Sequence, residues 1–583
     1  MPHTTRSLRL AFLSCTVLAA CAQHATQAPR STSADAPPAG APAPLADEAD
    51  ASPHAPPPVA AAEALYEPAP TVAANAAADG RRKLARRPAR GAPGGAAANV
   101  VGGAPVAVQP KPAPNTAGEG YPDFEEQPFV AVADDPRSTF SIDVDTASYA
   151  NVRRYLTSGA LPPPEAVRTE EIVNYFDYDY PEPTGRAPFA VVTEVGPAPW
   201  QPNHRLVHIG LQAKKIDLLR TPPRNLVFLL DVSGSMNSPD KLPLLKRSLA
   251  LLVDGMRPRD RIGIVVYAGA SGVVLPPTND RAAVLEALAR LEAGGSTNGA
   301  AGIEAAYALA RQAFVPDGIN RVILATDGDF NVGAQSPAAL RRLIERKREE
   351  GIFLSVLGFG TGNLQDRTMQ VLAQHGNGNH AYIDSLAEAR KVLVEEAGGT
   401  LVTVAKDVKI QVEFNPLQVA AYRLIGYETR RLADRDFNDD RKDAGEIGAG
   451  HTVTALYEVI PVGQPVPSAT DPLKYQAPVA PTPAARSGEL LTVRLRYKHP
   501  RGARSRLLEV PVRDDERPLA RTSNDFRFAA AAAEFALLLR ASPYAGKASW
   551  DQVIGLAQGA LGPDPAGRRR QFLDLARRAA TLR

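Results

Sequence analysis

The sequence predicts an α/β protein, in which a doubly wound, mostly parallel sheet is inserted in or flanked by a β-sandwich and C-terminal helices follow. Three observations support this fold class. Short apolar segments alternate with helical patterns between residues 224 and 399, which is typical of a parallel sheet with helices on both faces. Segments with a period-two hydrophobic pattern lie on either side of this region. Helical spacing returns after residue 520.

Residues 1–20 have the pattern of a signal peptide. Arg6 and Arg9 precede the apolar run Leu10–Ala20, which is too short to span a bilayer. The run ends in Leu-Ala-Ala-Cys at Cys21 and resembles the bacterial lipobox, which implies cleavage before Cys21 and lipid on its thiol and new amino group. An ordinary secretory peptide is the alternative. Ala22 follows in place of the Asp of an inner-membrane retention signal, so we expect a lipid-anchored protein of the cell envelope, in the outer membrane of a Gram-negative bacterium.

Residues 21–118 are rich in Ala, Pro and Gly and hold almost no large apolar side chain. Such a segment cannot bury enough surface to fold, so we expect a disordered tether that reaches away from a membrane surface. Residues 119–185 are predicted as an N-terminal module. Within it, Asp143 and Asp145 are expected to be outward-facing charges on a half-buried strand rather than metal ligands.

The remaining elements follow from the hydrophobic periods. Residues 186–223 hold alternating segments at 189–195 and 205–211, predicted as antiparallel strands of a sandwich. Residues 400–520 return to this pattern at 408–414, 453–460 and 491–497. Each of these strands needs a second layer to cover its apolar face. We therefore expect the two groups of strands to pair, with the α/β domain inserted between them. Residues 521–583 predict helices at 526–539, 549–557 and 568–582.

Residues 224–399 are predicted as one α/β domain. The predicted strands are 225–231, 261–267, 321–326, 352–358 and 380–384, with a possible antiparallel edge at 273–275. The predicted helices are 240–256, 281–291, 300–314, 337–350 and 364–374. Strands that are apolar along their whole length, such as 225–231, indicate burial on both faces of a parallel sheet.

Oxygen-bearing side chains follow two of these strands. Asp231, Ser233 and Ser235 come at the end of the first, Asp327 comes after the strand 321–326, and Thr297 lies in a loop between two helices. In open α/β sheets, ligands bind at the carboxyl ends of strands. A set made only of oxygen ligands favours Mg²⁺ or Mn²⁺ over zinc or copper. The alternative is that these residues merely cap helices and turns.

The D-x-S-x-S segment, the separate Thr loop and T-D-G after an apolar strand resemble the metal-ion-dependent adhesion site of the von Willebrand factor A (VWA) family. Residues up to about Pro183 resemble the module beside the A domain in bacterial YfbK-type proteins. The resemblance implies that Asp231, Ser233, Ser235, Thr297 and Asp327 hold a divalent ion. It also implies that the Asp or Glu of a protein partner completes the metal shell.

Other function classes find less support in the sequence. The net charge of +3 over 583 residues does not predict nucleic-acid binding. No G-x-S-x-G, phosphate-loop or H-E-x-x-H motif is present, so we expect no enzyme and no catalytic residues. His204, His208, His375 and His380 are expected to be surface or strand residues. Two alternatives stay open: a structural envelope protein in which the metal only rigidifies loops, and a hydrolase in which folding brings a His to Asp231 and Ser233.

Overall fold

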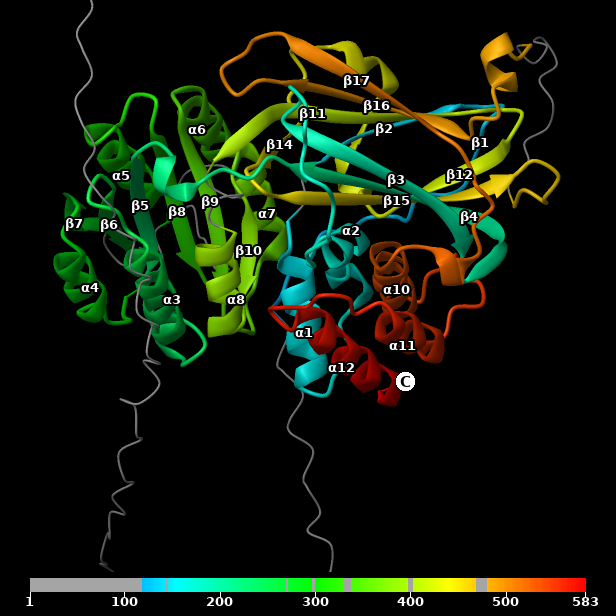
Figure 1. Ribbon diagram of the computed structural model, residues 1–583. Coiled ribbons are helices and arrows are strands. Elements are labelled where there is room, and N and C mark those ends of the chain that lie inside the picture. Colours follow the sequence, from blue (N-terminus) through cyan, green and yellow to red (C-terminus); the bar gives the residue numbers. More distant parts are fainter. Residues whose placement is uncertain are drawn as a thin grey trace, which may run out of the picture. The chain divides into compact units, whose positions relative to one another are not determined.

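The computed structural model describes residues 118–142, 145–268, 271–295, 299–328, 337–396, 402–467 and 480–582. In this part of the chain the strands form three sheets, drawn as arrows in Figure 1. One sheet is the centre of an α/β domain, and the other two share a core as a sandwich. The predicted signal peptide, Cys21 and the predicted tether up to residue 117 lie outside the described residues.

The α/β domain is built on a six-stranded sheet with the order β10-β9-β8-β5-β6-β7. Its strands are β5 (Arg224–Asp231), β6 (Arg261–Tyr267), β7 (Ser271–Thr278), β8 (Ile319–Thr326), β9 (Ile352–Phe359) and β10 (His380–Ile383). All neighbours are parallel except β7, which pairs antiparallel with β6. The predicted parallel sheet and its antiparallel edge strand are confirmed.

Helices cover both faces of this sheet, as the alternating pattern predicts. They are α3 (Leu242–Asp254), α4 (Arg281–Ala289), α5 (Gly299–Gln312), α6 (Pro337–Glu349), α7 (Asp366–His375) and α8 (Leu386–Arg390), which a π-helical turn continues. Phe228 of β5 lies in the core formed with α3, α4 and α8. Its neighbour Leu229 lies in the core formed with α5, α6 and α7. Successive side chains of a strand point to opposite faces, so β5 anchors both cores.

The other two sheets are antiparallel, with the orders β1-β12-β15-β4-β3 and β13-β2-β11-β16-β17, and β14 also pairs with β11. Their strands are β1 (Val130–Ala131), β2 (Arg137–Ser141), β3 (Phe189–Ala198), β4 (Gln201–Ala213), β11 (Thr403–Phe414), β12 (Val419–Ile425), β13 (Arg431–Leu432), β14 (Gly445–Gly448), β15 (Thr452–Pro461), β16 (Leu491–Lys498) and β17 (Ser505–Val512). Leu211 of β4 lies opposite Val453 of β15. It shares a buried core with Ile410 of the other sheet. Strands from before and after the α/β domain therefore pair, as expected, and the domain is inserted into the sandwich.

Residues 119–185 contribute to two parts of the fold. β1 and β2 are strands of the sandwich, and Phe140 of β2 lies opposite Ile410 of β11. The helices α1 (Ala147–Thr157) and α2 (Thr169–Val173) instead contribute to a core with the C-terminal helices. The physical reason is that these elements are short and each needs a second layer to cover its apolar side.

The structure corrects the prediction that Asp145 is an outward-facing charge, because this residue is buried. One carboxylate oxygen accepts a hydrogen bond of 2.8 Å from the backbone N–H of His380. The other lies 3.3 Å from a guanidinium nitrogen of Arg430. These partners are 235 and 285 positions away in the sequence, so the local pattern could not reveal them. Asp143 lies outside the described residues.

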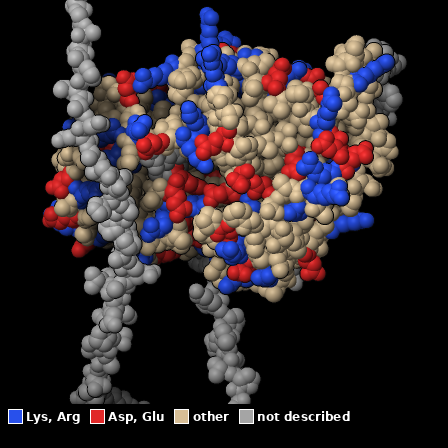
Figure 2. All heavy atoms as spheres, in the orientation of Figure 1, with Lys and Arg blue, Asp and Glu red and all other residues tan. Residues whose placement is uncertain are grey.

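The surface mixes charges of both signs. On the face drawn in Figure 2, the described Lys and Arg side chains lie among Asp and Glu side chains, in keeping with the net charge of +3. Some form exposed ion pairs, such as Arg290 with Glu286 at 3.3 Å on α4. Exposed pairs of this kind contribute little to stability.

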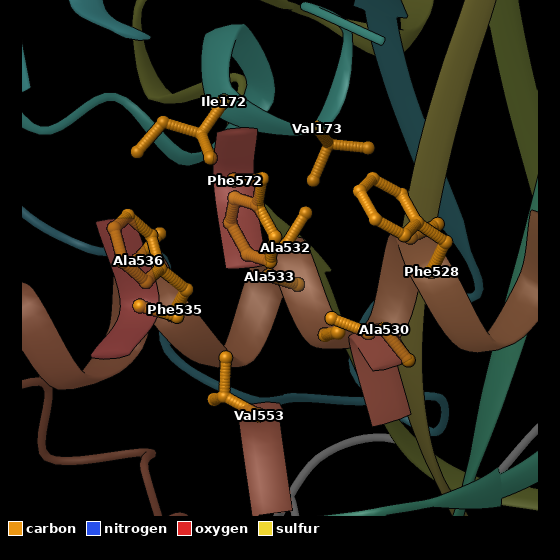
Figure 3. Close-up of a cluster of buried hydrophobic side chains, with 14 of the residues drawn as sticks. Ile172, Val173, Phe528, Ala530, Ala532, Ala533, Phe535, Ala536, Val553 and Phe572 are labelled. Carbon is orange, nitrogen blue, oxygen red and sulfur yellow. The ribbon is translucent and has the colours of Figure 1, made fainter. Parts of the chain in front are cut away.

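The C-terminal helices α10 (Asn524–Leu539), α11 (Trp550–Gly559) and α12 (Arg568–Thr581) form a further core with α1 and α2. Figure 3 shows Phe528 and Phe535 of α10 packing among side chains of these neighbours, including Ile172, Val553 and Phe572. The helices that the sequence predicts at this end are confirmed. In the described part of the chain, no helix combines the length and apolar character needed to cross a bilayer.

Candidate metal centre

The first part of the candidate site is the turn that follows β5. Asp231 is the last residue of the strand and is fully buried. The backbone N–H of Ser233 donates to Asp231 Oδ1 at 2.9 Å, which holds the turn against the carboxylate. The chain then enters a short 3₁₀ helix, Gly234–Asn237, and the hydroxyl oxygens of Ser233 and Ser235 lie 3.0 Å apart. Ser235 is exposed, so the site can be reached from solvent on this side.

The second part comes from β8, the direct neighbour of β5 in the sheet. Asp327 follows the last residue of β8 and is fully buried. The hydroxyl of Thr326 donates to Asp231 Oδ2 at 3.1 Å, and the hydroxyl of Tyr267, at the end of β6, donates to the same oxygen at 3.2 Å. The ends of three parallel strands therefore meet around Asp231.

Position 328, which completes the T-D-G segment, requires glycine because of its backbone conformation and its close neighbours. Its φ is +107°, and a Cβ there would lie 2.4 Å from the backbone nitrogen of Gln365. A side chain at this position would thus displace the loop after β9 and move Asp327 with it.

Thr297 lies outside the described residues, so its place relative to Asp231 stays a prediction. The residues just before it are described, and they hydrogen-bond to the turn after β5. The N–H of Gly294 donates to the carbonyl of Val232 at 2.7 Å, and the N–H of Gly234 donates to the carbonyl of Gly295 at 3.1 Å. The loop that carries Thr297 therefore starts beside Ser233 and Ser235.

A lysine that the sequence did not single out belongs to the site. Lys241 is buried at the start of α3, and its ammonium lies 2.9 Å from Asp327 Oδ2 and 3.1 Å from Asn363 Oδ1. Its aliphatic stem lies against Gly360, where a Cβ would come within 2.3 Å of it. Asn363 and Gly360 lie about 120 positions further along the chain, so spacing along the sequence gave no signal for this contact.

The two carboxylates differ in their electrostatics. Burial raises the pKa of Asp231, and the negative charge of Asp327 adds to this effect. Burial acts in the same direction on Asp327, but hydrogen bonds from Lys241, Asn363 and Ser235 outweigh it and lower the pKa of Asp327. Asp231 is therefore the carboxylate that still lacks a counter-charge.

The donor set fits a hard divalent cation. Two carboxylates and two hydroxyls come together from the described residues, and oxygen donors of this kind suit Mg²⁺ or Mn²⁺. Among the described residues, no group of three or more His, Cys, Asp and Glu has the arrangement of a metal site. A site here would therefore depend on its hydroxyl groups as much as on its carboxylates.

The four histidines named from the sequence have partners of their own. His204 lies 2.6 Å from Glu458 and His208 lies 2.8 Å from the hydroxyl of Tyr180, both in the sandwich. His375 lies 2.9 Å from Glu345 and His380 lies 3.0 Å from Asp366, both in the α/β domain. Their contacts are thus with residues other than Asp231 and Ser233.

Comparison with known proteins gives matches along most of the chain. Residues 226–329 match the model of the von Willebrand factor type A domain, residues 115–208 match a model described as von Willebrand factor, and residues 399–582 match the C-terminal region of the uncharacterized protein YfbK. The UPF0353 protein Rv1481 of Mycobacterium tuberculosis (strain ATCC 25618 / H37Rv) is 27% identical over 198 residues, 29% of this chain and 59% of that protein. A solved structure of a von Willebrand factor type A protein from Catenulispora acidiphila is 19% identical, covers 68% of this chain and 91% of its own, and has a TM-score of 0.37.

The uncharacterized protein YfbK of Escherichia coli (strain K12) is 45% identical to this chain over 464 residues. The alignment covers 78% of this chain and 80% of that protein. An alignment of this length necessarily includes the α/β domain. The chain belongs to the YfbK family of VWA-domain proteins.

Proposed function

We propose that this protein binds Mg²⁺ or Mn²⁺ through Asp231, Ser233, Ser235, Thr297 and Asp327, and that it holds a protein partner by taking one of the partner's carboxylates at the ion. The observation that carries the proposal is the meeting of two buried carboxylates, Asp231 and Asp327, with an exposed hydroxyl, Ser235, at the ends of adjacent strands. When bound, the ion would supply a positive charge and one open coordination position on the solvent side.

The number of ligands supports an open position. Mg²⁺ takes six oxygen ligands, and the chain offers five candidate groups at this edge of the sheet. Asp231 is held by N–H and O–H donors on both oxygens, so it is already oriented before an ion arrives. Lys241 neutralises part of the charge of Asp327. A site with few uncompensated carboxylates leaves the ion attractive to a carboxylate from outside.

We further propose that the protein lies in the cell envelope, tethered through lipid on Cys21. Several acyl chains would anchor the chain firmly, where one would hold only marginally. In full-length protein made in a Gram-negative host, we expect labelled fatty acid on the native chain and not on Cys21→Ser. The Cys21→Ser protein should also leave the membrane fraction, and equal membrane retention of both would contradict the lipid anchor.

The metal site is tested by calorimetry on the full chain. Asp231→Ala should abolish Mg²⁺ and Mn²⁺ binding while far-ultraviolet circular dichroism stays unchanged. The matched control is Asp254→Ala, which removes an exposed carboxylate from α3 and should bind both ions as the native protein does. Native metal affinity in Asp231→Ala would overturn the assignment of these ligands.

The partner is tested by capture from envelope extract in Mg²⁺ and in EDTA. A partner that is held in Mg²⁺, released by EDTA and lost with Asp231→Ala supports binding through the ion. A partner held equally in all three conditions would favour a structural envelope protein, whose metal only rigidifies the loops. The hydrolase alternative would need a base beside Asp231 and Ser233, and the four histidines named above contact other residues.

A further inference from the structure

A cavity of about 400 Å³ lies between the α/β domain and the sandwich, at the end of β8 away from Asp327. Cationic side chains dominate its wall, which includes Arg321, Arg348, Arg430, Arg431 and Lys442. Its acidic side chains are Asp443 and Glu446. A volume of this size is typical of a site for a small ligand.

Arg321, near the start of β8, is the unusual member of this wall. It is 3% exposed, and among the described residues it makes no ion pair with a carboxylate. One guanidinium nitrogen donates to the hydroxyl of Ser355 at 2.6 Å, whereas Nε has no hydrogen-bond partner. Burial lowers the pKa of Arg321 to about 10, so the side chain is still charged at neutral pH. A buried charge without a partner is costly, and most proteins avoid it.

The acidic side chains of the wall form their hydrogen bonds and ion pairs with other residues, and the negative charge of Glu446 only partly offsets the effect of burial on Arg321. Asp443 pairs with Arg348 at 2.6 Å. The two carboxylate oxygens of Glu446 accept hydrogen bonds from Asn377 at 3.0 Å and Thr403 at 2.9 Å.

Further cations add to the excess of positive charge. Arg430 is engaged with Asp145, at 3.3 Å. Arg431 is exposed, and no ion pair is found for it in the described part of the chain. The cavity thus has a buried arginine at its base and an unpaired arginine at its rim.

We propose that this cavity binds a small organic oxyanion, whose phosphate or carboxylate group pairs with Arg321. Guanidinium groups bind both kinds of oxyanion through two parallel hydrogen bonds, and Nε of Arg321 still lacks a hydrogen-bond partner. Arg431 contributes positive charge at the entrance. The site is separate from the metal centre, since Arg321 and Asp327 are six residues apart on an extended strand, roughly 20 Å.

The experiment is calorimetric titration of the full chain with inorganic phosphate and, separately, with citrate, at constant ionic strength near neutral pH. Native protein should show saturable binding of one of these probes, and the stronger probe indicates whether the natural ligand carries phosphate or carboxylate. Arg321→Met should weaken that binding by about tenfold or more. The matched control Arg342→Gln removes an exposed arginine of α6 and should bind as native.

Thermal unfolding shows whether the variants are folded. In buffer without either probe, Arg321→Met should unfold at or above the native temperature, because it removes a buried unpaired charge. If it does not fold, Arg321→Lys keeps the charge, loses the planar fork and should bind the probe more weakly than native. Absence of saturable binding for both probes, or equal binding by native and Arg321-substituted protein, would overturn the proposal. Asp231→Ala should retain probe binding, which separates this test from that of the metal centre.

Discussion

Two buried clusters of ionised groups, one between α2 and the α/β domain and one within that domain, are neutralised to different extents. The first, here called the arginine cluster, consists of Arg168, Glu171, Asp366 and His380. In it the guanidinium of Arg168 lies 2.5 Å from both Glu171 and Asp366, and His380 lies 3.0 Å from the second oxygen of Asp366. The second is the candidate metal centre, where the ammonium of Lys241 pairs with Asp327 and, within the described part of the chain, Asp231 has no cation beside it.

The pKa values of two equally buried aspartates show the consequence. Asp366 and Asp231 are both fully buried, and burial alone raises the pKa of each. Arg168 and His380 reverse this effect and hold the pKa of Asp366 well below its usual value. No Lys, Arg or His of the described residues contacts Asp231, and its pKa is raised. The difference marks Asp231 as the place where a cation from outside would be stabilised.

The largest expected effect comes from breaking the arginine cluster. Arg168→Met leaves Glu171 and Asp366 buried without their shared cation, so we expect a loss of about 3–5 kcal/mol in the free energy of unfolding. Chemical denaturation of the full chain measures this. The control Arg186→Met removes an exposed arginine and should change stability by less than about 0.5 kcal/mol. A loss no larger than that of the control would show that the cluster does not stabilise the fold.

A smaller effect is expected when the metal centre loses its own cation. Lys241→Met removes the positive charge that Asp327 now holds, so the site presents two carboxylates with no internal counter-charge. We expect about tenfold tighter Mg²⁺ binding, about 1.4 kcal/mol, measured by calorimetry. Lys214→Met, an exposed substitution, is the control. Weaker binding in Lys241→Met would mean that Lys241 chiefly positions Asp327 rather than competing with the ion.

His380 gives the arginine cluster a pH dependence with a defined sign. Burial would lower the pKa of His380, but the hydrogen bond and charge of Asp366 raise it above its usual 6.5. A raised folded-state pKa contributes stability that is complete below about pH 6.5 and lost as pH rises through the folded-state value. His380→Asn should therefore flatten the loss of stability above pH 6.5, measured by denaturation at several pH values. His499→Asn, at an exposed histidine, should keep the native slope.

The sequence was most informative where partners are close along the chain or follow a regular period. The turn from Asp231 to Ser235 occupies five consecutive residues at the end of an apolar strand, so the closeness of its carboxylate and hydroxyl groups could be predicted directly. The pairing of β4 with β15 followed from period-two hydrophobicity on both sides of the inserted domain. Both features depend on patterns that a strand must satisfy wherever its partner lies.

The sequence failed where a charge is paired across the fold. Asp145 has the local pattern of an exposed strand residue, and its contacts with Arg430 and the backbone N–H of His380 explain its burial. Arg168 precedes an ordinary short helix, yet it contacts Asp366 198 positions away. In the sequence, Lys241 has the pattern of a solvent-exposed residue at the start of a helix. In the structure, it lies against Gly360 and Asn363. Hydrophobic periods can be recognised in a single sequence, whereas the partners of buried charges cannot be inferred from its local patterns.

The smallest expected effect tests whether the arginine cluster stabilises the fold more than a surface ion pair does because it is buried, and not simply because its charges are paired. Glu286 and Arg290 form an ion pair at 3.3 Å on α4, and their side chains are 68% and 67% exposed. Water and salt screen such a pair, and both side chains lose conformational freedom in forming it. Glu286→Ala should therefore change the free energy of unfolding by about 0.5 kcal/mol or less. A loss close to that of Arg168→Met would mean that pairing alone stabilises this protein, and the distinction between its paired and under-neutralised buried sites would lose its physical basis.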